Sequence, residues 1–316
     1  MTSETQDYRV DEDSRSSLEL IADRAFLWIN RILAFSVAAV LVWLAIEVTR
    51  AGVPAIKEFG ASFLTTSAWN PPEENYGILP MIYGTVVSSL IGLLIAVPIA
   101  IASAIVLSEN FLPVSVRTVL TFLVELLAAI PSVVYGLWGI FVLIPFITWI
   151  GGGLHQYFGW IPLFSTQPIG PGMLPAGVIL AIMILPIITA ISRDSLASLP
   201  PELRSASYGV GSTRWQTIFS ILIPAAFSGI VGGIMLGLGR ALGETMAVTM
   251  VIGNSNDLSI SLFAPGNTIA SLIASQFPEA SGLQESSLMY AGAVLFLITL
   301  VVNMLAEWIV RQVKKY

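Results

Sequence analysis

Six stretches of the chain are long and almost continuously apolar, and polar segments separate them. About twenty apolar residues, rising ~1.5 Å each, cross the hydrocarbon core of a membrane as one helix. Runs this uniformly apolar differ from the alternating strands of a membrane barrel, so helices are predicted. The predicted spans cover residues 27–48, 78–107, 118–149, 173–192, 225–252 and 288–310.

The third stretch is longer than a bilayer requires. As one straight helix, residues 119–150 would measure ~48 Å, against a hydrocarbon core of ~30 Å. Pro131 and Pro145 are places where this helix can bend or break. Broken helices at membrane depth line cavities, which points towards transport. Length alone leaves a tilted helix with an interfacial extension equally open.

Composition supports an all-α membrane protein as the fold class. Hydrophobic residues make up 55% of the chain, charged residues 11%, and the mean hydropathy is +0.84. A typical soluble protein is about 25% charged. Seven of the 20 acidic residues lie in the first 23 positions, so residues 1–25 are predicted to be a mobile tail and 26–316 the membrane domain. The chain has no cysteine and a single histidine, His155, which leaves little material for metal or triad chemistry.

Positive charges predict the orientation of the spans. Arg193, Arg204 and Arg214 lie between spans four and five, and more basic residues follow span six. The segments 150–172 and 253–287 contain neither Lys nor Arg. Because basic loops stay on the cytoplasmic side, both termini and the loop between spans four and five are expected there.

The loop 193–224 carries signals of its own structure. Pro201 and Glu202 suit the first turn of a helix, and Gly211 lies just beyond its expected end. Thr213 and Gln216 have the spacing of a capping box, which predicts a second helix leading into span five. A loop with this much structure and an apolar face is expected to dock onto a partner, although packing beneath its own bundle is the simpler alternative.

Two charged residues lie within span five, Arg240 and Glu244. In one continuous helix they are one turn apart, so an i,i+4 ion pair is predicted. Each charge at the bilayer centre costs at least about 2.5–3.5 kcal/mol on insertion scales. One hypothesis is that the pair pins helices together. The favoured one is that Arg240 meets an anion crossing the membrane, while Glu244 neutralises it when no substrate is present.

Small residues surround this pair. Gly229, Gly233 and Gly237 recur at every fourth position and form a ridge that lets another helix approach closely. The partner is predicted to be a second subunit, span three or simply another helix of the same chain.

Span three offers further candidates for a pathway. Glu125 is its only charged residue, and we expect it to pair with Arg240 or Arg117 or to line the pathway. Ser132 and Tyr135 follow Pro131 and carry hydroxyl groups suited to hydrogen bonding with an anion.

The loop 193–224 also resembles a known family. Ser205-Ala206-Ser207, Gly211 and Pro224 are spaced as in the "EAA" loop of ABC importer permeases, which contacts the ATPase subunits. Ser205 stands where the family has glutamate, and Glu202, one turn earlier, is the candidate replacement.

Three further motifs narrow the resemblance to phosphate importer permeases of the PstC type. They begin at Leu238 (LGRALGETMAV), Glu125 (ELLAAIPSVVYG) and Asn75 (NYGILP). The resemblance implies the type I ABC importer fold with a cytoplasmic coupling helix, placed in a prokaryotic plasma membrane. It also implies a PstA-type sister permease, two PstB-type ATPase subunits carrying ATP and Mg, and a PstS-type binding protein. In that family the residues matching Arg240 and Glu244 are associated with phosphate passage.

No ATP-binding P-loop of the form G-x-x-x-x-G-K-[ST] occurs in the sequence, and no catalytic constellation is evident. The chain is therefore expected to be non-catalytic by itself, to need a separate ATPase, and to bind no nucleic acid. A permease for another oxyanion, such as sulfate or molybdate, is the nearest alternative. A secondary anion transporter is the alternative from a different class, and it is disfavoured because no internal repeat is visible.

Overall fold

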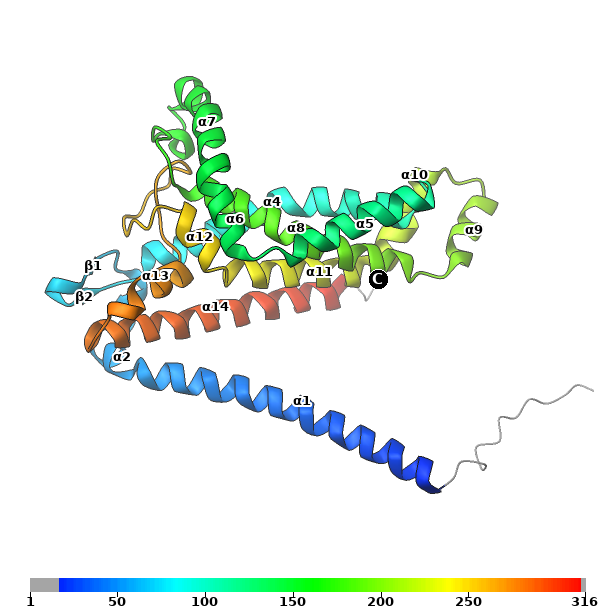
Figure 1. Cartoon of the computed structure of the whole chain (residues 1–316), viewed down its shortest axis with the longest axis horizontal. Coiled ribbons are helices and arrows are strands. Elements are labelled where there is room, and N and C mark those ends of the chain that lie inside the picture. Colours follow the sequence, from blue (N-terminus) through cyan, green and yellow to red (C-terminus); the bar gives the residue numbers. More distant parts are fainter. Residues whose placement is uncertain (1–16, 314–316) are drawn as a thin grey trace, which may run out of the picture. The chain divides into compact units, whose positions relative to one another are not determined.

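The computed structural model describes residues 17–313, which are mostly helical (Figure 1). One two-stranded antiparallel ribbon pairs Trp69 with Tyr76. The elements are α1 (Ser17–Ala51), α2 (Val53–Phe59), α3 (Ser62–Thr65), β1 (Trp69–Asn70), β2 (Asn75–Tyr76), α4 (Leu79–Ser108), α5 (Val114–Ala129), α6 (Ser132–Trp138), α7 (Ile144–Phe158), α8 (Met173–Ala197), α9 (Pro201–Gly209), α10 (Arg214–Thr217), α11 (Ile223–Leu242), α12 (Met246–Val251), α13 (Ile269–Gln276) and α14 (Leu283–Val313).

The chain divides into two units, with the boundary after Arg50. The first contains α1, which begins at Ser17, so the last residues of the predicted tail are helical. Residues 1–16 of that tail lie outside the described part of the chain. The second unit holds all other elements and the hydrophobic core.

Six helices within residues 17–313 are long and apolar enough to cross a membrane, as predicted. They cover Ile21–Ala51, Leu79–Ser108, Ser132–Phe158, Met173–Ala197, Arg214–Leu242 and Leu283–Trp308. Two π-helical turns, Gly139–Leu143 and Ile218–Leu222, join α6 to α7 and α10 to α11. The chain is thus an all-α, multi-pass membrane protein.

The predicted third span, residues 118–149, is wrong as a single helix. The chain breaks at Ile130 and Pro131, because proline has no N–H to donate and its ring crowds the preceding turn. Helix α5 runs alongside α8, whereas α7 runs across the direction of α4, α8 and α11 (Figure 1). Of the two alternatives for this stretch, the broken helix is therefore correct.

The predicted fifth span, residues 225–252, is displaced towards the N-terminus. The helix begins at Arg214, where the capping box between Thr213 and Gln216 is present as predicted. It ends at Leu242, and Gly243 separates it from the short helix α12. Glycine favours such an interruption because its backbone loses the most freedom within a helix.

Helix α8 lies at the centre of the bundle, packed against α4, α5 and α11. The glycine ridge of α11 faces it, since a Cβ on Gly229 would lie 2.0 Å from Ser195 Oγ and one on Gly237 would lie 2.9 Å from Ile188 Cγ1. The ridge therefore serves packing within the chain, the simplest of the predicted alternatives, and brings two helix backbones close together.

This packing predicts that Gly229→Ala lowers the free energy of unfolding by about 1–3 kcal/mol, because the added methyl group overpacks the contact with α8. Gly232→Ala in the same helix is the matched control, since a Cβ there meets nothing within 4 Å. Thermal unfolding of the purified protein in detergent measures both. Equal melting temperatures for the two variants would contradict the proposed contact.

Candidate functional site

Two interrupted helices meet near the middle of the bundle. Gly237 of α11 packs against Ile184 and Ile188, which are central residues of α8. The break after Leu242 therefore lies level with the middle of α8, because α11 runs antiparallel to it. Tyr135, which follows the other break, lines a cavity together with Ile182 and so lies at the same level. Non-helical backbone at membrane depth is tolerated where it is buried in protein or lines a water-filled cavity.

The first break is stabilised by Tyr135. In a continuous helix the N–H of residue 131 would bond to the Leu127 carbonyl, but proline has none. The Leu127 carbonyl instead accepts hydrogen bonds from the Tyr135 hydroxyl at 2.8 Å and from the Ile130 N–H at 3.4 Å. Tyr135 is thus buried and bridges the two helix segments, so in this conformation its proton is not available to an anion. The prediction that Tyr135 donates to a substrate is not supported by this arrangement.

The second break is held against the first by close helix packing. A Cβ on Gly136 of α6 would lie 2.5 Å from Met250 Sδ and 3.3 Å from Ala247 Cα, both in α12. Glycine at this position allows α6 and α12 to touch. The segments that follow the two breaks therefore form one contact layer.

Arg240 lies beside this layer, in the last turn of α11. Its side chain is exposed in the single chain, and among residues 17–313 it forms neither an ion pair nor a hydrogen bond. The negative end of the α11 dipole favours a cation at this position.

The predicted ion pair between Arg240 and Glu244 is wrong. It required one continuous helix, whereas α11 ends at Leu242. The Glu244 carboxylate instead accepts a hydrogen bond from the Ala247 N–H at 3.1 Å, which caps the first turn of α12. Arg240 is left without a carboxylate partner in the described chain.

The other candidates of span three separate in space. Ser132 is the first residue of α6 and is half-buried at the break. Glu125 pairs with Arg193 of α8, with 3.4 Å between Oε1 and Nη1, and not with Arg240 or Arg117 as expected. Ser132 thus belongs to the layer near Arg240, while Glu125 ties α5 to the C-terminal part of α8.

The cavity at this level is apolar. It measures about 300 Å³ and is bounded by Leu127, Ile130, Val134, Tyr135, Trp138 and Ile182. Arg240 does not line it. An anion passing Arg240 would therefore be enclosed only when another surface covers the exposed side of α11.

A second cluster of candidates lies at the far end of the bundle, where α9 and α10 project (Figure 1). Glu202, Ser205 and Ala206 of α9 are exposed, as a docking surface requires. Ser207 is buried and hydrogen-bonds to Thr217 at 2.8 Å, so it holds α9 against the next helix and does not face a partner.

Glycine and proline shape this end of the chain as the spacing predicted. Gly211 has a φ of +86°, a left-handed conformation that favours glycine and turns the chain between α9 and α10. Pro224 follows directly on the π-helical turn Ile218–Leu222 inside the helix that begins at Arg214, and its missing N–H removes one bond from the helical ladder there. Trp215 is 57% exposed and Val210 83%, which leaves an exposed apolar surface beside the turn.

The sequence reasoning missed a clamp beneath this surface. Arg204 of α9 binds Glu109, the C-cap of α4, with 2.7 Å between Nη2 and Oε1, and Glu109 is only 6% exposed. The same guanidinium donates to the carbonyls of Leu199 and Leu196. Nothing in the spacing of Glu109 and Arg204, 95 residues apart, signals this pair.

An aromatic contact reinforces the clamp. The Arg214 guanidinium lies 3.8 Å from the centre of the Phe111 ring, which also contacts Trp215. The linker between α4 and α5 is therefore held to both α9 and α10.

Solved structures of ABC transporters share this architecture. A chain of the bacterial alginate ABC transporter, solved with an alginate pentasaccharide-bound periplasmic protein, matches with a TM-score of 0.62 at 18% identity, covering 95% of this chain and 99% of that one. A chain of the inward-facing MetNI methionine ABC transporter matches with a TM-score of 0.54 at 18% identity, covering 75% and 94%. The fold is that of the type I ABC importer permeases.

Sequence comparison gives the family. The model of the binding-protein-dependent transport system inner membrane component matches residues 96–315, and the chain belongs to this family. The phosphate transport system permease protein PstC of Pasteurella multocida is 48% identical over 81% of this chain and 82% of its own length. That of Mesorhizobium japonicum is 45% identical over 93% and 91%, and the probable PstC of Methanocaldococcus jannaschii is 38% identical over 84% and 86%.

The clamp predicts that Arg204→Ala lowers the free energy of unfolding by about 2–3 kcal/mol, because the buried Glu109 carboxylate loses its cation. The expected cost lies below the ~3–5 kcal/mol of a fully buried pair, since Arg204 is 21% exposed. Arg311→Ala is the control, because its pair with Glu307 is exposed and contributes at most about 1 kcal/mol. If both variants have the same melting temperature, the clamp does not stabilise the end of the bundle that carries α9.

Proposed function

We propose that the chain is one of two membrane subunits of an ATP-driven phosphate importer and forms half of the path that the anion takes. The observation that carries this proposal is Arg240, a permanent cation near mid-bundle that is exposed and has no carboxylate partner in the described chain. A charge left in hydrocarbon costs several kcal/mol, so its exposed side must meet water, protein or an anion. The names of the relatives supply phosphate as the anion.

The chemistry of Arg240 suits this substrate. A guanidinium stays charged at every physiological pH and presents a planar fork of donors that fits phosphate oxygens. The Glu244 carboxylate caps α12 in this structure and follows Arg240 by four residues. Its negative charge would lower the affinity of Arg240 for the anion, which a carrier must keep low enough for release. Ser132 adds a hydroxyl at the neighbouring break.

A second permease subunit, of the PstA type, would cover the exposed face of α11 and complete the path. The surface of α9, with Glu202, Ser205 and Ala206, and the turn at Gly211 would receive one of two PstB-type ATPase subunits, which carry ATP and Mg. We expect this surface and both termini on the cytoplasmic side, because basic loops favour that side of the membrane. The opposite end, with β1, β2 and α13, would receive a PstS-type binding protein.

The proposal predicts that Arg240→Ala reduces phosphate uptake at least about tenfold, since hydrogen bonds to charged groups contribute about 1.5–3 kcal/mol each. Arg240→Lys keeps the charge and is expected to retain part of the activity. Labelled phosphate uptake by cells making the complete importer measures both, and co-purification of the ATPase shows that the complex still assembles.

Arg311→Ala, which changes an exposed ion pair on α14, is the matched control and should transport normally. Excess sulfate or molybdate should not compete with phosphate; competition would favour a permease for another oxyanion. Uptake by the assembled Arg240→Ala importer with unchanged phosphate dependence would refute the role of this residue.

A further inference from the structure

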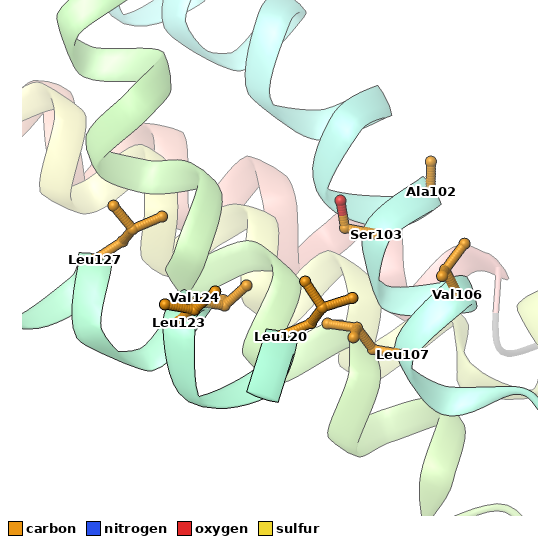
Figure 2. Close-up of a pocket in the computed structure, with 8 residues that line it drawn as sticks. All are labelled: Ala102, Ser103, Val106, Leu107, Leu120, Leu123, Val124 and Leu127. Carbon is orange, nitrogen blue, oxygen red and sulfur yellow. The ribbon is translucent and has the colours of Figure 1, made fainter. Parts of the chain in front are cut away.

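A groove runs between α4 and α5. It measures about 360 Å³ and is apolar apart from one hydroxyl group (Figure 2). Figure 2 shows Val106 and Ala102 on the α4 side and Leu120, Leu123 and Leu127 on the α5 side. Helix α5 has no buried residue, so this wall of the groove is open.

The groove continues into a second, polar pocket. The two share Leu107, and the second measures about 380 Å³. Its polar lining comprises Ser108, Arg117, Thr118, Thr121 and Arg193. It lies where α4 and α8 end, beside the linker that carries the clamp to α9. Together the groove and the pocket form a slot that is apolar along its length and basic at its end.

The two arginines of the polar pocket and the two carboxylates beside them sum to zero charge, but the carboxylates both pair with Arg193 and leave Arg117 without an ion pair. Arg193 is neutralised by Glu125 and Asp194, at 3.4 Å and 2.8 Å. Arg117 is half-buried and has no ion pair or side-chain hydrogen bond among residues 17–313. It also lies in the first turn of α5, where the positive end of the helix dipole repels a cation. An anionic ligand at this position would relieve both effects.

We propose that this slot binds an anionic phospholipid of the cytoplasmic leaflet, with its acyl chain along α4 and α5 and its phosphate at Arg117. The leaflet rests on the orientation given under the proposed function. Thr121, which makes no hydrogen bond within the described chain, supplies a free donor at the mouth. Basic pockets at the ends of apolar clefts between spanning helices suit anionic head groups. Free phosphate would use the basic end but would leave the apolar groove empty.

Native mass spectrometry of the purified complete importer, mixed with phosphatidylglycerol or phosphatidylcholine, tests this. The wild type is expected to retain phosphatidylglycerol about fivefold better, the factor for one basic residue near an anionic head group. Arg117→Gln should remove this preference, and Arg117→Lys should keep it. Ala102→Phe, which fills the groove, should lower the retention of both lipids.

Arg24→Gln is the matched control, because it removes an exposed basic residue of α1 and should leave the preference intact. Equal retention of the two lipids by the wild type, or an unchanged preference in Arg117→Gln, would overturn the inference. So would displacement of phosphatidylglycerol by millimolar inorganic phosphate, which would assign the basic end to the free anion. If the wild-type importer takes up phosphate normally but retains the two lipids equally, this inference alone is wrong and the proposed function stands.

Discussion

A permanent charge and unpaired backbone hydrogen-bonding groups are both costly in free energy within hydrocarbon, and this constraint governs the arrangement of the protein. Two helices stop near the middle of the bundle, after Ala129 and after Leu242, and Arg240 lies beside the second stop. Each interruption would expose unsatisfied backbone groups to lipid. The structure limits this cost locally, since Tyr135 satisfies the Leu127 carbonyl and Glu244 satisfies the Ala247 N–H. The guanidinium of Arg240 is the one group in this layer for which the described chain supplies no counter-charge.

A continuous set of contacts joins the proposed docking surface to this layer. Arg204 and Arg214 hold the linker between α4 and α5 through Glu109 and Phe111. That linker leads directly into α5, which ends at the break preceding Tyr135. Because α5 has no buried residue, it is less constrained by the bundle than α8. The ion pair of Glu125 with Arg193 also ties α5 to α8.

Much of this architecture could be predicted from sequence because it follows from local patterns. Apolar run length gave six spans, and the capping box at Thr213 correctly marked where a helix begins. Pro131 identified the place of the first break, although length alone did not separate a break from a tilt. In each case, the signal lies within a few neighbouring residues.

The errors arise where the outcome depends on contacts between distant segments. The ion pair of Arg240 with Glu244 assumed a helix that passes through Gly243, but packing of α12 against α6 favours a stop there. The partner of Glu125 proved to be Arg193, because α5 lies against α8. The clamp between Arg204 and Glu109 had no local signature at all.

The absence of cysteine from the sequence allows the central claim to be tested with a single introduced thiol. Arg240→Cys, in the assembled importer within membranes, should react with a water-soluble, membrane-impermeant thiol reagent, and attaching a cationic group should restore part of the uptake. Leu300→Cys, an exposed apolar position of α14, gives the background reactivity of the bundle surface. Reactivity at position 240 no higher than this background, from either side of the membrane, would mean that no aqueous path reaches the residue and would contradict the account.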